Sequence, residues 1–205
     1  MKLYYLPGAC SLADHIVIHW VGVPCEVARM SHESIKSPEY LAMNPGGMVP
    51  LLEHGDFRLT ENAAILGYLA DLHPEAGLFG DGSPRGRAEV SRWLAFLNSD
   101  VHGAFKPIFN PQRFVDDPEL ADVLRDKARA HAHPYLERLD TQLAGRDWLT
   151  GARSIADAYL FVILRWAAGK AIDLAGLDNL ARFTSRMLAD AGVLAALQAE
   201  GDSAH

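Results

Sequence analysis

Strand-forming segments are confined to the first 60 residues of this 205-residue chain, which limits the folds open to it. Residues 2–6 (KLYYL) and 24–30 (PCEVARM) are short apolar stretches typical of strands. Between them, Leu12, Ile16 and Trp20 recur at helical spacing, and Gly22 ends the run. A strand, a helix and a second strand in this order predict a parallel βαβ unit.

The next thirty or so residues extend the same unit. Residues 37–43 (SPEYLAM) predict a helical turn, and residues 44–47 (NPGG) are a strong turn signal. Two short apolar runs, 49–53 and 57–59, predict a β-hairpin, after which Thr60 is expected to cap a helix that stops before Pro74. The expected product is a mixed four-stranded sheet with helices.

Beyond this unit the chain predicts helices only. A segment rich in Gly and Pro (73–84) precedes helices that start at Pro84, at Pro118 and at a second S-x-x-D pattern, Ser154 to Asp157. Two further helices are expected at 178–190 and 193–200. We therefore expect an α/β domain at 1–76, a linker at 77–83 and an all-helical domain at 84–205.

Charge and cysteine content narrow the function classes. The formal net charge is −7 with no run of Lys or Arg, which argues against nucleic acid or an anionic membrane as the main partner. No segment reaches the roughly 20 apolar residues of a membrane span, and nothing resembles a signal peptide. Two cysteines are too few for a disulfide scaffold. We expect a soluble cytoplasmic protein with free thiols.

Cys10 is the residue whose position raises a chemical question. It directly precedes Ser11 and Asp14, an S-x-x-D capping pattern in which Ser11 is expected to cap the helix. A cysteine at a helix N-terminus sits in the positive end of the macrodipole, which favours the thiolate. Two interpretations stay open: a reactive thiol, or a small packed side chain. For Cys25 the packing interpretation is preferred.

Several segments together resemble one known family. MKLYYLPGACSLA, NPGGMVPLL, TENAAIL and WLTGARSIADAYLFVILRW, in this order over nearly the whole chain, resemble the bacterial beta class of the glutathione S-transferases. The resemblance implies a thioredoxin-like N-terminal domain joined to an all-helical domain. It also implies glutathione as co-substrate, hydrophobic electrophiles as second substrates, a role in detoxification and a homodimer. The apolar residues of the helix at 84–102 further suggest the dimer, because they exceed what one core needs.

The resemblance also implies a set of site residues. Cys10 matches the residue that faces the glutathione sulfur, and His102 matches a histidine that points into the site from the helical domain. The glutathione-binding residues implied are Ala9, Cys10, Lys36, Val49, Pro50, Glu61, Asn62 and His102. Val49 precedes a proline that is cis in the family, and Glu61 with Asn62 matches the pair that holds the γ-glutamyl group. Gly103 departs from the family, in which a lysine often follows the histidine, and Lys106 is a partial substitute.

The same resemblance implies a function. The resemblance implies transfer of glutathione to an electrophile in an apolar pocket lined by Leu6, Phe105, Phe109 and Trp166, with thiol–disulfide exchange at Cys10 as a variant. The alternative is a non-enzymatic ligand carrier or interaction module on the same fold. His15 and His19 have i, i+4 spacing but no evident third ligand, so no metal site is expected.

Overall fold

The N-terminal third of the chain folds as a sheet with helices. The structure is a computed structural model that describes residues 1–201. Strand β1 (Lys2–Tyr5), helix α1 (Ser11–Val21) and strand β2 (Glu26–Arg29) form the predicted βαβ unit, with β1 and β2 parallel. A 3₁₀ turn (Ser34–Lys36) and helix α2 (Pro38–Met43) follow.

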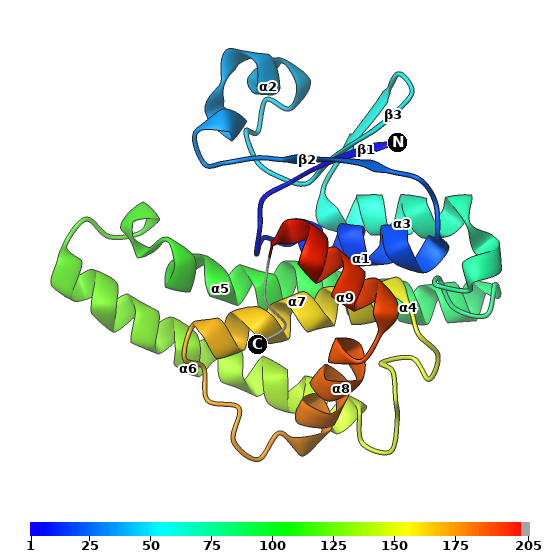
Figure 1. The fold of residues 1–205 in the computed structure, drawn as a ribbon. Coiled ribbons are helices and arrows are strands. Elements are labelled where there is room, and N and C mark those ends of the chain that lie inside the picture. Colours follow the sequence, from blue (N-terminus) through cyan, green and yellow to red (C-terminus); the bar gives the residue numbers. More distant parts are fainter. Residues whose placement is uncertain (202–205) are drawn as a thin grey trace.

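A β-hairpin completes the sheet. Strands β3 (Leu51–His54) and β4 (Phe57–Thr60) are antiparallel, and β3 also pairs antiparallel with β1, so the order is β2-β1-β3-β4. Helix α3 (Asn62–Leu72) lies beside α1 on the face of the sheet that meets the helical domain, while α2 lies on the far side (Figure 1). The mixed four-stranded sheet predicted from the sequence is confirmed.

Both caps predicted in this unit, Ser11 and Thr60, are wrong. Ser37 does cap α2, its hydroxyl accepting from the Tyr40 N–H. The N-cap of α1, however, is Cys10, because the Ser11 hydroxyl is bonded instead to the N–H and carbonyl of Leu6. The N-cap of α3 is Glu61 and not Thr60, which remains in β4. In both cases the residue predicted as the cap makes another contact: Ser11 bonds to the Leu6 backbone, and Thr60 pairs within the hairpin.

The remainder of the described chain is helical, as predicted. After a 3₁₀ turn (Pro74–Ala76), helix α4 (Pro84–Phe96) passes through a π-helical segment, η3 (Leu97–Val101), into α5 (His102–Phe109). A 3₁₀ turn (Pro111–Arg113) precedes the long α6 (Pro118–Gln142), and α7 (Ile155–Gly169), α8 (Asp178–Leu188) and α9 (Ala191–Glu200) complete the chain. Sequence periodicity does not predict the π-helical segment. Among residues 1–201, no helix is both long enough and apolar enough to cross a bilayer.

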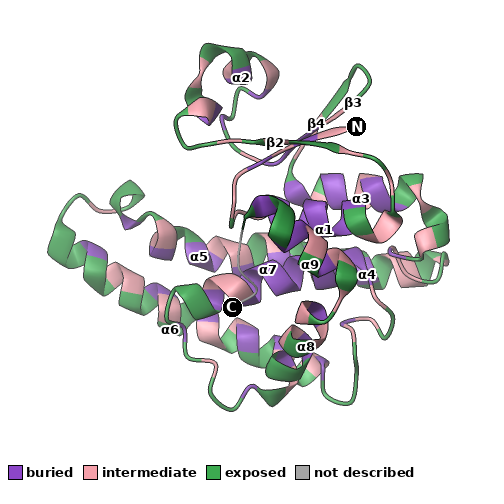
Figure 2. Ribbon diagram, viewed as in Figure 1, coloured by how far each residue is buried: buried purple, intermediate pink, exposed green. Residues whose placement is uncertain are grey.

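Helix α7 forms the centre of the helical domain. Ile155 to Leu164 are all buried, and Figure 2 shows that burial decreases only toward the C-terminal end of the helix. The predicted capping box is present at its start: the Asp157 carboxylate accepts from the Ser154 N–H at 2.8 Å and from the Ser154 hydroxyl at 2.7 Å. A helix this apolar packs on all sides. Its apolar pattern therefore does not mark its first residue, and the capping box does.

We expect Ser154→Ala to lower the free energy of unfolding by about 0.5–2 kcal/mol, because the change removes a buried N-terminal capping hydroxyl. Chemical denaturation monitored by circular dichroism measures the effect. An unchanged midpoint at equal m-value would show that the hydroxyl adds nothing to the helix start.

Candidate active site

The Cys10 sulfur faces the loop that leads into β3. Residues Pro7 to Ala9 turn the chain from β1 into α1, with Gly8 at φ +75°, a conformation that favours glycine. Cys10 Sγ lies 3.9 Å from the carbonyl oxygen of Val49, and the Val49-Pro50 peptide bond is cis. The structure therefore brings the predicted Cys10, Val49 and Pro50 together.

Two side chains from the helical domain hold this turn. The Trp166 indole N–H donates to the Gly8 carbonyl at 2.8 Å. The Gly8 N–H donates to Glu200 Oε2 at 3.4 Å, and Glu200 Oε1 lies 3.3 Å from His15 Nδ1. Figure 1 shows α9, which carries Glu200, lying across α1. The position of Cys10 thus depends on residues more than 150 positions away in sequence.

Burial, and not the helix terminus, dominates the acidity of Cys10. Loss of solvation raises the pKa of its thiol to about 12, and the nearby Asp14 carboxyl raises it further, while backbone N–H groups at the helix start oppose both effects. Asp14 is completely buried. The expectation of a thiolate favoured by the macrodipole is therefore not met, and the raised pKa makes Cys10 a neutral thiol near pH 7.

A raised thiol pKa has a measurable consequence. In Cys25→Ser protein, which leaves Cys10 as the remaining thiol, we expect the rate of alkylation by iodoacetamide to rise about tenfold per pH unit from about pH 7 to about pH 10. The reason is that the thiolate fraction grows tenfold per unit at every pH below the pKa. A plateau near pH 8 would contradict a raised pKa.

The two residues at the start of α3 differ in what they offer a ligand. Glu61 is exposed and has φ +69°, uncommon for a residue with a side chain. Asn62 is buried, and its amide, oriented to satisfy its acceptors, donates to the Asp14 carboxylate and to the Cys10 carbonyl, each at 3.0 Å. Asn62 therefore supports the start of α1 from beneath and leaves Glu61 as the side chain open to solvent.

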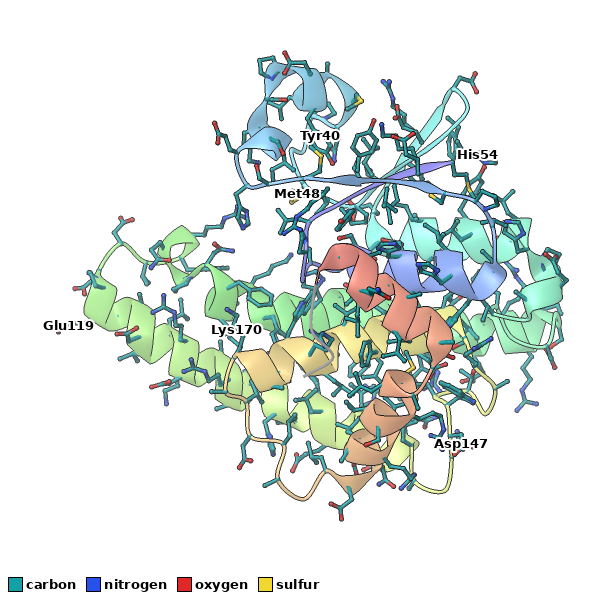
Figure 3. All side chains as sticks on the ribbon, in the orientation of Figure 1. Tyr40, Met48, His54, Glu119, Asp147 and Lys170 are labelled. Atoms are coloured by element: carbon teal, nitrogen blue, oxygen red, sulfur yellow. The ribbon has the colours of Figure 1, made fainter. Side chains whose placement is uncertain are left out.

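The loop around Lys36 is tied to the segment before the cis proline. Lys36 Nζ donates to the Gly47 carbonyl at 2.7 Å. The Tyr40 hydroxyl and the Asn44 amide both donate to the Met48 carbonyl at 2.7 Å, and Figure 3 shows Tyr40 and Met48 close together beneath α2. These bonds occupy the carbonyls of Gly47 and Met48, so the Val49 carbonyl, which faces Cys10, is the next one along the loop.

His102 lies at the junction between η3 and α5, with its ring in contact with aromatic side chains. Its Nδ1 lies 2.5 Å from the Tyr159 hydroxyl, and its ring centroid lies 4.8 Å from that of Trp166. Burial, aided by the charge of Lys106, lowers the pKa of His102 to about 4. The side chain is therefore neutral at physiological pH and carries a lone pair on one ring nitrogen.

Lys106 places a positive charge near His102. Gly103, at the position where the family often has a lysine, instead borders a cavity of about 520 Å³ between η3–α5 and α6, which is also lined by Lys127, His131 and Tyr135. A side chain at residue 103 would extend into that open space, since no atom lies within 4 Å of an added Cβ.

Three predicted pocket residues form one aromatic cluster. The Trp166 ring lies 5.8 Å from Phe105 and 5.2 Å from Phe109, between ring centroids, and Phe105 and Phe109 lie 5.7 Å apart. Phe105 is completely buried, so it supports the other two rings from behind. Leu6 follows β1, directly before the turn that Trp166 holds.

Sequence reasoning missed four residues of this region. Tyr159 and Asn98 contact or flank His102, Glu200 holds Gly8, and Asp14 lies buried behind Cys10. Tyr159 carried a usable signal, because a tyrosine in a fully apolar helix needs a hydrogen-bond partner for its hydroxyl. Glu200 and Asn98 had none, since each acts through a contact that only the fold creates.

The chain matches two known domain families. Residues 1–71 match the glutathione S-transferase N-terminal domain, and residues 101–191 match the glutathione S-transferase C-terminal domain. The curated relative glutathione S-transferase GST-4.5 of Xanthomonas campestris pv. campestris is 51% identical over 202 residues, which cover 98% of this chain and 99% of the relative.

Solved structures give the same result. A glutathione S-transferase from Xylella fastidiosa is 50% identical with a TM-score of 0.96, covering 98% of this chain and 99% of the other. A sphingomonad glutathione S-transferase complexed with glutathione is 38% identical with a TM-score of 0.87, covering 99% and 100%. A beta-class enzyme from Sphingomonas chungbukensis is 37% identical with a TM-score of 0.86, covering 98% and 99%. The chain belongs to the glutathione S-transferase family of enzymes, and its architecture is that of the bacterial beta class.

Proposed function

We propose that this enzyme conjugates glutathione to hydrophobic electrophiles at the junction of its two domains, in the cytoplasm and in a detoxifying role. One observation carries the proposal: the Cys10 sulfur lies 3.9 Å from the Val49 carbonyl, beside a turn that Trp166 ties to the helical domain. A thiol-containing peptide paired with the Val49 backbone would bring its sulfur to Cys10. The glutathione bound by the sphingomonad relative supports the same ligand here.

The side chains around Cys10 would each have a separate role in the conjugation reaction. Cys10, kept a neutral thiol by its raised pKa, would donate an S–H hydrogen bond to the glutathione thiolate. His102, neutral because of its low pKa, would accept the proton that glutathione gives up. Phe109 and Trp166, backed by Phe105, offer an apolar surface for the electrophile.

The glutathione backbone would extend from Cys10 toward α3 and Lys36. Exposed Glu61 would pair with the γ-glutamyl ammonium group, and Asn62 would contribute its backbone at the start of α3, since its side chain is already bonded inside the protein. Ala9, Val49 and Pro50 would line the cysteinyl unit. Lys36 would meet the glycine carboxylate by exchanging its bond to the Gly47 carbonyl.

Thiol–disulfide exchange is the second reaction proposed for the same site. The Cys10 thiolate would attack one sulfur of oxidised glutathione, forming a Cys10–glutathione disulfide and releasing the other half as glutathione thiolate. The proton lost from Cys10 would go to His102 or to water. No further oxidant is needed, because the disulfide supplies the two oxidising equivalents.

Binding and turnover test the proposal together. We expect the protein to be retained on immobilised glutathione and to conjugate a generic aryl halide electrophile. His102→Gln should lower kcat, while the matched control His133→Gln, on α6 and outside both this site and the cavity beside Gly103, should match the unchanged enzyme. Lack of both retention and turnover would replace this proposal with the ligand-carrier alternative.

We also propose that two copies pair as a homodimer. The apolar side chains of α4 do not support this as we expected, because Val90, Trp93, Leu94 and Phe96 are all buried within one chain. Support comes instead from Phe57 at the sheet edge, which is 45% exposed, and from the cavity of about 520 Å³ between α5 and α6. In a two-fold dimer, each projecting ring can fill the other copy's cavity.

Light scattering at micromolar concentration is expected to give twice the monomer mass. Phe57→Ala should weaken the dimer, whereas Phe114→Ala, which removes a ring that is more exposed (55% against 45%) and lies remote from the sheet, should leave it intact. A monomer at these concentrations would contradict the pairing.

A further inference from the structure

Three side chains form a hydrogen-bonded row that ends at His102. His102 Nδ1 lies 2.5 Å from the Tyr159 hydroxyl oxygen, which in turn lies 3.3 Å from Asn98 Oδ1. Tyr159 comes from the buried centre of α7 and is completely inaccessible to solvent. Asn98 and His102 lie four residues apart on the same continuous helix, Asn98 within the π-helical segment and His102 directly after it. Such π-helical turns are frequent at functional sites.

The chemistry of the groups gives the row a direction. The Asn98 carbonyl oxygen, as the amide is assigned, can only accept, so the Tyr159 hydroxyl donates to it. The Tyr159 oxygen is then free to accept, and its partner is the N–H at Nδ1 of His102. Tyr159 stays protonated, because burial strongly raises the pKa of its hydroxyl. Neutral His102 carries one ring proton, which leaves Nε2 with a lone pair.

We propose that Tyr159 and Asn98 are positioning residues that hold neutral His102 in the tautomer protonated at Nδ1, so that Nε2 is the nitrogen that takes the thiol proton of glutathione. This inference rests on the proposed function of His102. In the step, the S–H bond of glutathione breaks and an N–H bond forms at Nε2, giving a thiolate and an imidazolium. The proton then leaves to water or to the departing group of the electrophile.

The row suits this step because it need not change when the proton arrives. The Nδ1–H to Tyr159 bond and the Tyr159 to Asn98 bond exist in both the neutral and the protonated ring. In the other tautomer, Tyr159 would donate to Nδ1 and turn its lone pairs toward the Asn98 oxygen. Uptake of a proton by that ring would require the whole row to reverse.

Nitrogen-15 NMR of histidine-labelled enzyme reads the tautomer directly. The His102 signals are assigned by their loss in His102→Gln. We expect the Nδ1–H tautomer in the wild-type enzyme near neutral pH and a shift toward the Nε2–H tautomer in Tyr159→Phe, which keeps the buried ring but removes its oxygen. Asn98→Asp keeps an acceptor at the end of the row and should retain the wild-type tautomer, whereas Asn98→Leu should not.

Kinetics separate positioning from a structural role. Tyr159→Phe should lower kcat at least about tenfold with the KM for glutathione little changed, because the wrong tautomer impairs proton transfer and not binding. Asn98→Asp should stay within about threefold of wild type by the same reasoning. An Nε2–H tautomer in the wild type, or an unchanged tautomer in Tyr159→Phe, would overturn the inference. Absence of glutathione conjugation by the wild-type enzyme would instead contradict the proposed function. The NMR measurement of the His102 tautomer does not depend on that activity.

Discussion

Oxidised glutathione is expected to add one glutathionyl group to Cys10 and none to Cys25. Acidity does not favour reaction at Cys10, because burial raises the pKa of both thiols. Selectivity comes from the site: Cys10 faces the carbonyl of Val49, beside which a glutathione half can bind, whereas Cys25 contacts the carbonyl of its own neighbour Glu26. Binding at this distance raises the effective concentration of the disulfide at one sulfur.

Intact and peptide mass spectrometry measure the adduct. Cys10→Ala should abolish it and remove thiol-transfer activity, while Cys25→Ser should keep both. Conjugation should fall less in Cys10→Ala, because bound glutathione supplies its own thiol and His102 remains to take its proton. An adduct found only on Cys25, or full thiol transfer in Cys10→Ala, would show that Cys10 is a packed residue and not a reactive one.

Asp157→Ala is expected to lower the free energy of unfolding by about 3–5 kcal/mol, more than any cap change in the molecule. The Asp157 carboxylate is completely buried and accepts from the Ser154 N–H, the Ser154 hydroxyl and the Leu149 N–H at 2.7–2.9 Å. Its removal leaves two buried backbone donors without partners. It also frees the loop that leads into α7, since Leu149 belongs to that loop.

Urea denaturation of Asp157→Ala beside Ser154→Ala tests this ranking. The serine variant loses one hydroxyl and keeps the carboxylate with both backbone donors, so it should retain most of the stability. Because the two residues share a hydrogen bond, the double variant should lose less than the sum of the single losses. A loss in Asp157→Ala no larger than that in Ser154→Ala would mean that water replaces the missing acceptor at both donors.

The sequence alone determined the elements and their order, because those depend on contacts between near neighbours. Helical spacing in α1 and α7, the Ser154–Asp157 box and the Ser37 cap involve residues within a few positions of one another. The family motifs added the fold and the expected positions of Cys10 and His102. The same local rules wrongly predicted Ser11 and Thr60 as caps. The Ser11 hydroxyl bonds to the Leu6 backbone instead, and Thr60 belongs to β4.

Only the tertiary structure decided the chemical state of the site residues. The thiol pKa of Cys10 follows from burial against Asp14, and the neutral state of His102 follows from burial beside Tyr159 and Trp166. The bonds from Trp166 and Glu200 to Gly8 join residues 158 and 192 positions apart. Solvation and hydrogen bonding depend on which atoms surround a group in space, and in this protein some of those atoms, on Trp166 and Glu200, lie far along the chain from the turn that they hold.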